Sequence, residues 1–375
     1  MLKLLPYVLK HKLSYRWGWP RVLPINVTIS VTFNCPSRCL TCNVTSRKAK
    51  ELTVEEYRRI FRSLGRDPFW VTISGGEPFL RPDLPEIVDA IMAESGPEII
   101  NIPTSGTTHK HIFAFLPRML ERTKGIQFTV NFSLDELGER HDQIRRTPHN
   151  WEKTLESIRF AKSLKKTYPH LVVGIHSVIS VFNVKRFPEI YEGLMELEPD
   201  SYITEVAEER AELLTVGTGI TPPPETYAEA ADFLIARMKS NRRKGYASIV
   251  EAFRLEYYEL TKRILAERRQ VIPCYAGLTS CHIAADGDLW GCCVRAEPVG
   301  NLRDVDYDFP RLWQGWAAKK FRRSVKNLEC QCPLANASYT NMLLDAGSLV
   351  RVGRNLAGAA GTQLARRRPR GGSVS

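Results

Sequence analysis

The chain has 375 residues, of which 43% are apolar and 25% are charged, a globular composition that excludes collagen-like, mucin-like and largely disordered proteins. Its formal net charge is +12, from 53 Lys and Arg against 41 Asp and Glu. The charge is uneven, because residues 1–50 and 351–375 contain no acid while the 300 residues between them carry 38 cations and 41 anions. A near-neutral body argues against a nucleic-acid-binding protein.

No stretch approaches the roughly 20 apolar residues that a membrane-spanning helix needs, and the N-terminal segment MLKLLPYVLKHK lacks the cleavage site of a signal peptide. Nine cysteines in a long chain without an export signal indicate a reducing compartment, where such clusters more often serve metal or redox chemistry than disulfides. We therefore predict a cytoplasmic protein. The basic termini make peripheral contact with an anionic membrane the alternative, and packing of the N-terminal segment over the body the simpler interpretation.

From Ile25 to about Val206, short β-branched runs alternate with amphipathic helical patterns. The predicted strands are Asn26–Thr32, Phe69–Ser74, Ile99–Thr104, Gln127–Ser133, Leu171–Ile179 and Tyr202–Val206. The predicted helices are Val54–Leu64, Leu84–Ser95, His111–Arg122, Trp151–Lys166 and Lys185–Leu197. Thr53 and Glu56 have the spacing of a capping box, and Asp83 is placed to cap the second helix. This alternation predicts a parallel α/β sheet with right-handed crossovers and its chemistry at the C-terminal ends of the strands.

The pattern changes after Ile220, where TPPPETY predicts a linker. Two helices follow, at about Thr226–Lys239 and Tyr246–Arg269, and the second is expected to pack against the α/β body. A cysteine-rich segment then runs to Met342, and the final LAGAAGTQLARRRPRGGSVS is predicted to be a weakly ordered tail. The predicted divisions are a basic N-terminal segment (1–24), an α/β barrel (25–220), a helical linker (221–270), a cysteine-rich domain (271–345) and a basic tail (346–375).

Three cysteines with the spacing C-x3-C-x2-C follow the first predicted strand: Cys35, Cys39 and Cys42. Three thiolates on one short loop can hold three corners of a [4Fe–4S] cube, which leaves the fourth iron open to a reactive ligand. A zinc site and buried free thiols are the alternatives. Zinc usually takes four ligands from paired CxxC or His motifs, and this loop offers no nearby His.

This loop resembles the signature of the radical S-adenosylmethionine (SAM) superfamily. The next strand ends in Ser74-Gly75-Gly76-Glu77-Pro78, similar to the superfamily's GGEP motif, in which glycines let the backbone approach a ligand and the peptide groups and Glu77 receive an amino group. Weaker matches are Thr104 in a polar-Gly turn and the stretch from Ser133 to Arg145. His141 and Asp142, within that stretch, are expected to cap the following turn. The resemblance implies these SAM-binding residues: Gly75, Gly76, Glu77, Pro78, Thr104, Ser133 and Arg145.

In this family Ser133 and Arg145 would hold the methionine carboxylate of SAM, a task that suits a bidentate Arg. The resemblance implies a partial (β/α)6 TIM-like barrel and a reaction in which SAM chelates the open iron. An electron from a donor such as flavodoxin or ferredoxin then cleaves SAM, and the 5′-deoxyadenosyl radical abstracts hydrogen from a substrate.

Six further cysteines lie beyond the barrel: Cys274, Cys281, Cys292, Cys293, Cys330 and Cys332. The pattern C-x12-G-x4-C followed by Gly300-Asn301-Leu302 resembles the SPASM extension or its shorter Twitch form, which bind auxiliary [4Fe–4S] clusters. The segment Asp286-Gly287-Asp288 predicts a hairpin turn. Too few cysteines follow Leu302 for a full SPASM module, so the resemblance implies one cluster on Cys274, Cys292, Cys330 and Cys332. Cys281 and Cys293 are then spare, and a structural zinc ion is the alternative.

The family acts on several classes of substrate. About 25 residues precede the first strand, fewer than the N-terminal peptide-binding domain of many peptide-modifying members needs. We therefore expect a small-molecule or lipid-linked substrate and an oxidation, epimerisation or rearrangement. A peptide or protein maturase with the same chemistry is the second hypothesis, and a non-catalytic iron–sulfur or zinc-binding protein is the third.

Overall fold

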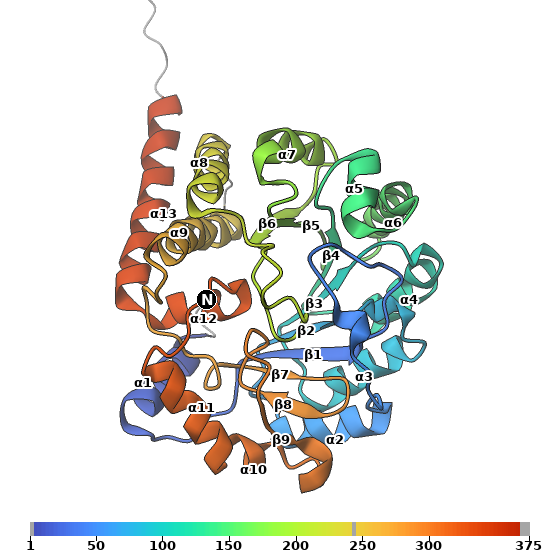
Figure 1. The fold of residues 1–375 in the computed structure, drawn as a ribbon, viewed down its shortest axis with the longest axis vertical. Coiled ribbons are helices and arrows are strands. Elements are labelled where there is room, and N and C mark those ends of the chain that lie inside the picture. Colours follow the sequence, from blue (N-terminus) through green and yellow to red (C-terminus); the bar gives the residue numbers. More distant parts are fainter. Residues whose placement is uncertain (1–3, 242–244, 368–375) are drawn as a thin grey trace, which may run out of the picture.

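The computed structural model describes residues 4–241 and 245–367 (Figure 1). Its main feature is a sheet in the order β6-β5-β4-β3-β2-β1-β7-β8-β9, in which the first six strands are parallel. These six are β1 (Asn26–Thr32), β2 (Trp70–Gly75), β3 (Ile99–Thr104), β4 (Gln127–Ser133), β5 (Leu171–Ile179) and β6 (Ser201–Val206). Every predicted strand lies within one residue of the observed one, and the predicted α/β fold is confirmed. Because the strands are parallel, their carboxyl ends meet at one edge of the sheet.

Helices cover the outer face of the curved sheet (Figure 1). They are α2 (Val54–Leu64), α3 (Leu84–Glu94), α4 (His109–Arg122), α6 (Asn150–Leu164) and α7 (Phe187–Met195), all within two residues of the prediction. A further helix that the sequence did not predict, α5 (Gly138–Arg145), follows β4. Val27, Ile29 and Val31 of β1 alternate along the strand, so they share one face of the sheet, where all three are buried in the apolar core. The opposite face of β1 carries the polar residues Asn26, Ser30 and Thr32, which are buried as well.

The two predicted helix caps have different outcomes. At α2, Thr53 and Glu56 form the predicted capping box, in which the Glu56 N–H donates to Thr53 Oγ1 (3.2 Å) and the Thr53 N–H donates to Glu56 Oε2 (2.7 Å). Asp83 is the N-cap residue of α3, but its side chain makes no cap hydrogen bond. The carboxylate of Asp83 instead accepts two hydrogen bonds from Arg81, a closer and charged donor.

The C-terminal segment is helical where the sequence predicted a weakly ordered tail. Residues Ala346–Arg367 form one helix, α13, which lies beside α9 (Tyr246–Glu267) in Figure 1, so the predicted tail is wrong over this range. The segment is rich in helix-forming Ala, Leu and Arg, and Val352 is buried. Arg351 Nε also lies 2.6 Å from Glu256 Oε1 of α9. Residues 368–375 lie outside the described residues.

The cysteine-rich segment extends the barrel sheet instead of forming a separate one. Strands β7 (Ser280–Ile283) and β8 (Asp288–Trp290) form the predicted hairpin, with Gly287 at φ +90° in its turn. β7 pairs in parallel with β1, and β9 (Pro298–Asn301) pairs with β8. Short helices follow: η5 (Leu302–Val305), α10 (Phe309–Trp313), α11 (Trp316–Lys326) and α12 (Ala335–Leu344).

The remaining α-helices of the described residues are α1 (Leu5–Trp17) and α8 (Pro224–Ser240), and one-turn helices η2 (Val44–Ser46), η3 (Pro78–Leu80) and η4 (Val184–Arg186) lie in the loops. The prediction for α8 was right to within two residues at each end. In α1 the His11 ring is buried and bonds to the main-chain oxygens of Tyr7 (2.7 Å) and Leu23 (3.0 Å), which holds one face of the helix against the body. No helix of the described residues is long and apolar enough to cross a membrane.

Candidate active site

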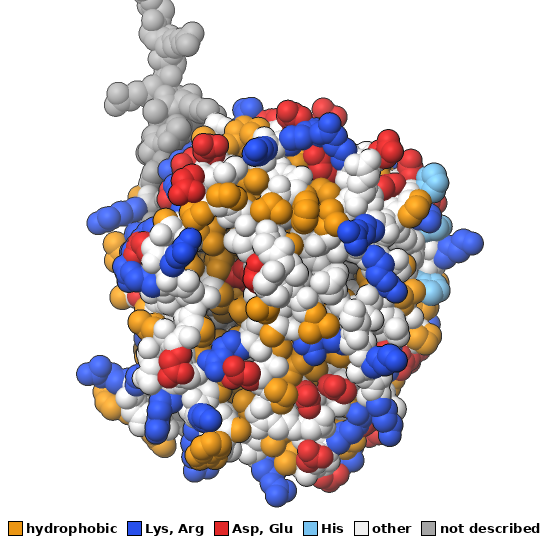
Figure 2. Space-filling view, viewed as in Figure 1, with side chains coloured by type: hydrophobic (Ala, Val, Ile, Leu, Met, Phe, Trp, Pro, Cys, Tyr) orange, Lys and Arg blue, Asp and Glu red, His pale blue; other side chains and the backbone are white. Residues whose placement is uncertain are grey.

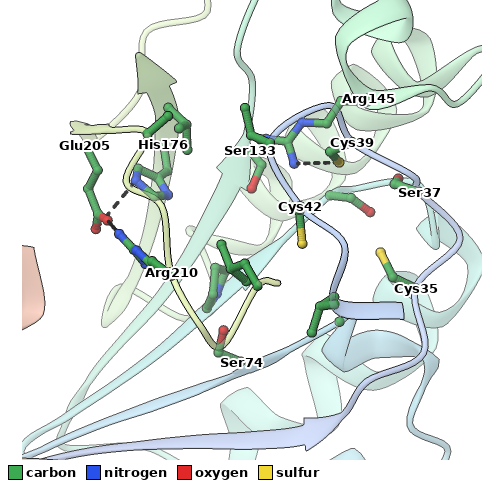
Figure 3. A pocket seen from close by; sticks show the side chains of 18 of the residues that line it. Cys35, Ser37, Cys39, Cys42, Ser74, Ser133, Arg145, His176, Glu205 and Arg210 are labelled. Carbon is green, nitrogen blue, oxygen red and sulfur yellow. Dashed lines mark hydrogen bonds and ion pairs between the residues drawn. The ribbon is translucent and has the colours of Figure 1, made fainter. Parts of the chain in front are cut away.

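The three cysteines after β1, here called the loop cysteines (Cys35, Cys39 and Cys42), line a pocket at the carboxyl ends of the parallel strands (Figure 3). The main chain fixes this loop from two directions. The Leu40 N–H donates to the Ile144 oxygen of α5, and the Asn43 N–H donates to the Leu213 oxygen after β6, both at 2.9 Å. The loop therefore bridges two segments of the barrel rim that are far apart in sequence.

The loop cysteines all line one pocket, which suits metal binding better than the enclosed position of a core thiol such as Cys281. Burial, with the neighbouring Glu77 carboxylate, raises the pKa of Cys35 to about 12, and burial raises the pKa of Cys42 to about 12. As free thiols both would be protonated at neutral pH, and bonding to a metal ion is the ordinary way to stabilise several buried thiolates together. The donor set of three sulfurs on one loop fits three irons of a [4Fe–4S] cluster.

The spacing of the sulfurs argues against a single zinc ion. Among the described residues, one group of three or more possible ligands has all its atoms within 4.8 Å of one another: Glu212, His282 and Cys293. The loop cysteines do not form such a group. Zinc bonds sulfur at about 2.3 Å, so two sulfurs on one ion are at most about 4.6 Å apart. In a cube each cysteine binds a different iron, so a wider spacing fits.

The glycines of the Ser74–Pro78 motif bring β2 against the cysteine loop. A Cβ at Gly75, where φ is +118°, would lie 2.2 Å from the Thr32 oxygen, and a Cβ at Gly76 would lie 2.1 Å from the Asn34 oxygen. The space is closed by main-chain hydrogen bonds from Gly76 to Thr32 and from Glu77 to Asn34, both 2.8 Å. The two glycines thus serve close contact between backbones as well as lining the pocket.

Glu77 is 1% exposed and occupied by protein donors. Its carboxylate accepts from the Thr104 hydroxyl (2.8 Å), from the N–H and hydroxyl of Ser105 (2.7 and 2.6 Å) and from the Phe79 N–H (3.2 Å). In this structure Glu77 and Thr104 therefore tie the end of β2 to the end of β3. Pro78 begins the short helix η3 (Pro78–Leu80) and is not among the residues that line the pocket.

Ser133 and Arg145 line the pocket beside the loop cysteines (Figure 3). Arg145 Nη1 lies 3.7 Å from Cys39 Sγ, and Arg145 Nε lies 2.8 Å from the buried carboxylate of Asp135. Burial by itself would lower the pKa of Arg145, but the Asp135 carboxylate and the Cys39 thiol raise it, so the guanidinium stays charged. A fixed cation beside the cysteine loop suits the predicted role of holding a carboxylate.

His141 and Asp142 both make structural hydrogen bonds near the start of α6. The Asp135 N–H donates to His141 Nδ1 (3.2 Å), so His141 Nε2 carries the proton and donates to Asn150 Oδ1 (2.6 Å). The Asp142 carboxylate accepts from the Trp151 N–H (2.8 Å) in the first turn of α6. The prediction that the side chain caps the following turn is confirmed for Asp142, whereas His141 bonds to the Asp135 N–H before α5 and to the Asn150 side chain.

Four charged or ionisable side chains that the sequence did not single out line the same pocket: His176, Glu205, Glu208 and Arg210. Arg210 pairs with Glu205 and with Glu208, each at 3.0 Å, and His176 Nε2 lies 3.7 Å from Glu205 (Figure 3). Burial raises the pKa of Glu208 to about 7, against the opposing effect of Arg210. The sequence could have indicated two of these residues, because His176 and Glu205 lie near the carboxyl ends of two predicted strands, where parallel sheets carry their functional side chains.

The four predicted auxiliary cysteines, Cys274, Cys292, Cys330 and Cys332, come together beyond the barrel. Burial, together with the neighbouring Cys274 and Cys330 thiols, raises the pKa of Cys292 to about 12. Burial also raises the pKa of Cys332, with contributions from Cys274 and Cys292. Among the described residues, no three of these sulfurs all lie within 4.8 Å of one another, whereas two sulfurs on one zinc ion are at most about 4.6 Å apart, so this donor set also fits a cluster better than zinc.

The two spare cysteines lie elsewhere. Cys281 is on β7, where burial alone raises its pKa, as expected of a core thiol. Cys293 faces Glu212 and His282 in a buried polar group, and His282 Nε2 lies 2.8 Å from Ser30 Oγ of β1. Cys293 is therefore turned toward the barrel.

A partial α/β barrel with a three-cysteine loop at its catalytic edge and a cysteine-rich extension defines an iron–sulfur enzyme fold. The radical SAM superfamily model matches residues 29–194, and the model of the SPASM iron–sulfur cluster-binding domain matches residues 274–333. The chain belongs to the radical SAM superfamily and carries a C-terminal SPASM domain. This membership implies a [4Fe–4S] cluster, SAM and auxiliary iron–sulfur binding, as predicted.

Sequence relatives cover most of the chain. It is 24% identical to the AdoMet-dependent heme synthase of Methanosarcina barkeri over 330 residues, 84% of this chain and 87% of the relative. It is 27% identical to a probable GTP 3′,8-cyclase of Methanocaldococcus jannaschii over 286 residues, 75% of this chain and 87% of the relative.

Two solved structures share the fold. Streptococcus suis SuiB bound to S-adenosylmethionine matches with a TM-score of 0.58 and 16% identity over 80% of this chain and 68% of SuiB. The structure of anSMEcpe with AdoMet and a peptide matches with a TM-score of 0.58 and 14% identity over 92% of this chain and 98% of the other. At these identities the similarity concerns the fold alone.

Proposed function

We propose that this radical SAM enzyme abstracts hydrogen from a small or lipid-linked substrate and so brings about its oxidation, epimerisation or rearrangement. The observation that carries the proposal is the charged group His176, Glu205, Glu208 and Arg210, which lines the same pocket as the loop cysteines. When bound, the [4Fe–4S] cluster and SAM supply a 5′-deoxyadenosyl radical.

In this proposal the residues divide between cofactor and substrate. The loop cysteines hold the cluster, Ser133 and Arg145 hold the methionine carboxylate, and the peptide groups of Gly75 and Gly76 face its amino group. Cys274, Cys292, Cys330 and Cys332 hold one auxiliary cluster. An external donor such as flavodoxin or ferredoxin supplies the electron. In this division of the chain, SAM and its cluster bind in the barrel (25–220), the auxiliary cluster binds in the cysteine-rich domain (271–345), and the linker (221–270) joins the two.

The charged group would orient a polar substrate. Arg210 pairs with Glu205 and with the Oε2 oxygen of Glu208, so a substrate hydroxyl or amine would find its acceptor in the other Glu208 oxygen. One Glu208 oxygen, Oε1, has no protein partner. With a pKa raised by burial to about 7, Glu208 can also hold or release a proton at the substrate near neutral pH.

The class of substrate is supported by the relatives. The heme synthase and the GTP cyclase, by their names, make or convert small molecules, and each matches at least 75% of this chain. The second candidate is a peptide maturase, which is favoured by the fold similarity to SuiB, a structure of which contains a precursor peptide.

The test is anaerobic reconstitution with iron and sulfide, followed by SAM and dithionite. We expect 5′-deoxyadenosine, and a rate increase when a low-mass or lipid extract is added. An increase with a peptide fraction alone would establish the maturase instead. Glu208→Gln should remove the substrate-dependent increase and keep the basal rate, because its carboxylate is assigned to the substrate. Formation of no 5′-deoxyadenosine at all would sink the enzyme hypothesis.

A further inference from the structure

Helix α1 presents its apolar side chains to solvent. Leu5, Leu9, Leu13 and Trp17 occupy every fourth position and are 57%, 56%, 37% and 68% exposed. The one buried residue among the described side chains of α1 is the polar His11, on the side that packs against the body. A helix on a globular surface normally buries its apolar stripe. The outward stripe therefore indicates a partner that covers it.

Two more tryptophans stand out from the same region. Trp19, just after α1, is 73% exposed, and Trp316, at the start of α11, is 75% exposed. The two helices are neighbours, because Lys326 Nζ of α11 donates to the Tyr15 main-chain oxygen of α1 at 3.4 Å. The exposed leucines and tryptophans thus belong to one surface, here called the α1–α11 face.

Two adjoining hollows of about 590 and 570 Å³ lie on this face. They share Tyr15, Arg16, Tyr275 and Lys326, and no acidic residue lines either of them. Figure 2 shows Lys and Arg side chains at the lower left of the molecule, where Figure 1 places α1 and α11. The cations that line the hollows are Lys12, Arg16, Arg21, Lys319, Arg322, Arg323 and Lys326.

These cations lack the partners that surface charges often have. Within the described part of the chain, none of the seven forms a salt bridge with Asp or Glu, although such pairs are frequent elsewhere on the surface. Arg322 and Arg21 bond to neutral oxygens, those of Gly277 and Gln314. The face therefore carries a concentrated positive potential that favours an anionic partner.

We propose that the α1–α11 face docks on an anionic lipid bilayer. The leucine and tryptophan side chains would enter the boundary between headgroups and acyl chains, and the cations of the two hollows would bind lipid phosphates. Leu and Trp along one helix with Lys and Arg beside them is the pattern of helices that lie in a membrane interface. Nucleic acid would meet the cations but has no favourable contact for the row of leucines.

Docking through the α1–α11 face would bring the auxiliary cysteines near the membrane. Cys274, one of its four cysteines, lines the larger hollow, as does the neighbouring Tyr275. A protein docked through this face would have its auxiliary site close to the lipid. This inference does not depend on the substrate of the barrel, and its test is a binding measurement.

The test is sedimentation of the reconstituted full-length protein with vesicles. We compare pure phosphatidylcholine with vesicles that also contain phosphatidylglycerol, at physiological salt. We expect binding to the anionic vesicles, weakened by salt. The doubles Leu9→Glu/Leu13→Glu and Lys319→Glu/Arg323→Glu should each weaken it by about tenfold or more, because the first removes apolar insertion and the second reverses two charges.

Matched controls carry the same chemical changes elsewhere. Val350→Glu changes an exposed apolar residue of α13, and Lys110→Glu/Lys166→Glu reverses two exposed cations near α4 and α6. These variants should bind like the wild type, and all variants should still form 5′-deoxyadenosine without vesicles. The proposal is overturned if anionic vesicles are not bound. It is also overturned if the leucine double binds normally, which would leave only a non-specific contact between cations and phosphates.

Discussion

The guanidinium of Arg145 lies 2.8 Å from the carboxylate of Asp135 and close to the sulfur of Cys39, at 3.7 Å. One side chain on α5 therefore joins the segment after β4 to the cysteine loop. A guanidinium has five N–H donors, so the ion pair with Asp135 leaves donors for a ligand in the pocket. The family resemblance assigns the methionine carboxylate of SAM to Arg145, and these two contacts hold its guanidinium beside the cysteine loop, as that role requires.

Arg145→Lys should weaken SAM binding by about tenfold or more, because lysine keeps the charge but cannot offer two parallel N–H bonds. Equilibrium binding of SAM to the reconstituted protein measures this, and the iron content should stay unchanged. Arg146→Lys is the matched control, since the neighbouring Arg146 is exposed at the end of α5. Unaltered SAM affinity in Arg145→Lys would remove the assigned role.

Gly76→Ala should release the cluster of the loop cysteines. The added Cβ would lie 2.1 Å from the Asn34 main-chain oxygen, one residue before Cys35, so the loop must move. We expect a loss of about four irons per chain, with the auxiliary irons retained. Gly353→Ala on α13 is the control, because its Cβ would meet no atom within 4 Å. A full iron content in Gly76→Ala would contradict the close approach.

Iron counting separates the two cysteine sites. Replacing Cys35, Cys39 and Cys42 together by Ala should leave about four irons per chain if the auxiliary site holds one [4Fe–4S] cluster. Cys332→Ser should reduce the auxiliary iron, whereas Cys293→Ser should not, because Cys293 faces Glu212 and His282. Iron and sulfide analysis of the purified variants measures this. About eight irons remaining in the triple variant would instead indicate a second auxiliary cluster.

The stability of the protein should depend on His141 below neutral pH. Burial lowers the pKa of this imidazole from 6.5 to about 4, so the folded protein binds its proton less readily than the unfolded chain does. Between pH 6.5 and 4 the unfolded chain is the more protonated at this group, and the folded state loses stability as the pH falls. The loss is about 3 kcal/mol at most across this window.

Denaturant unfolding at several pH values tests this dependence. His141→Gln loses the contacts with Asn150 and Asp135, so the free energy of unfolding of the variant should be lower than that of the wild type at pH 7. Because the variant also lacks the titrating imidazole, its free energy of unfolding should fall less between pH 6.5 and 4. His149→Gln, at an exposed position before α6, is the control. An equal slope in His141→Gln and wild type would show that another group carries the acid sensitivity.

Much of the architecture could be predicted from the sequence because its signals are local. The strands and most helices follow from hydrophobic periodicity, and the Thr53–Glu56 capping box from a spacing of three residues. The spacing of Cys35, Cys39 and Cys42 on one loop indicated a reactive metal site. The predicted tail was wrong at α13, where burial of Val352 and the contact of Arg351 with Glu256 of α9 stabilise a helix through residues that are distant in sequence.

Only the tertiary structure decided how distant residues combine. His176, Glu205 and Arg210 meet because β5 and β6 end at the same edge, which no local pattern encodes. Three of the four hydrogen bonds that Glu77 accepts come from Thr104 and Ser105 at the end of β3. Cys292 and Cys293 are adjacent in sequence, but Cys293 faces Glu212 and His282 whereas Cys292 lies with the auxiliary cysteines. Likewise, the spacing of the leucines in the sequence does not show whether the helix buries them or exposes them. The fold packs His11 inward, and that leaves the leucines of α1 facing solvent, because a helix has only one face to pack.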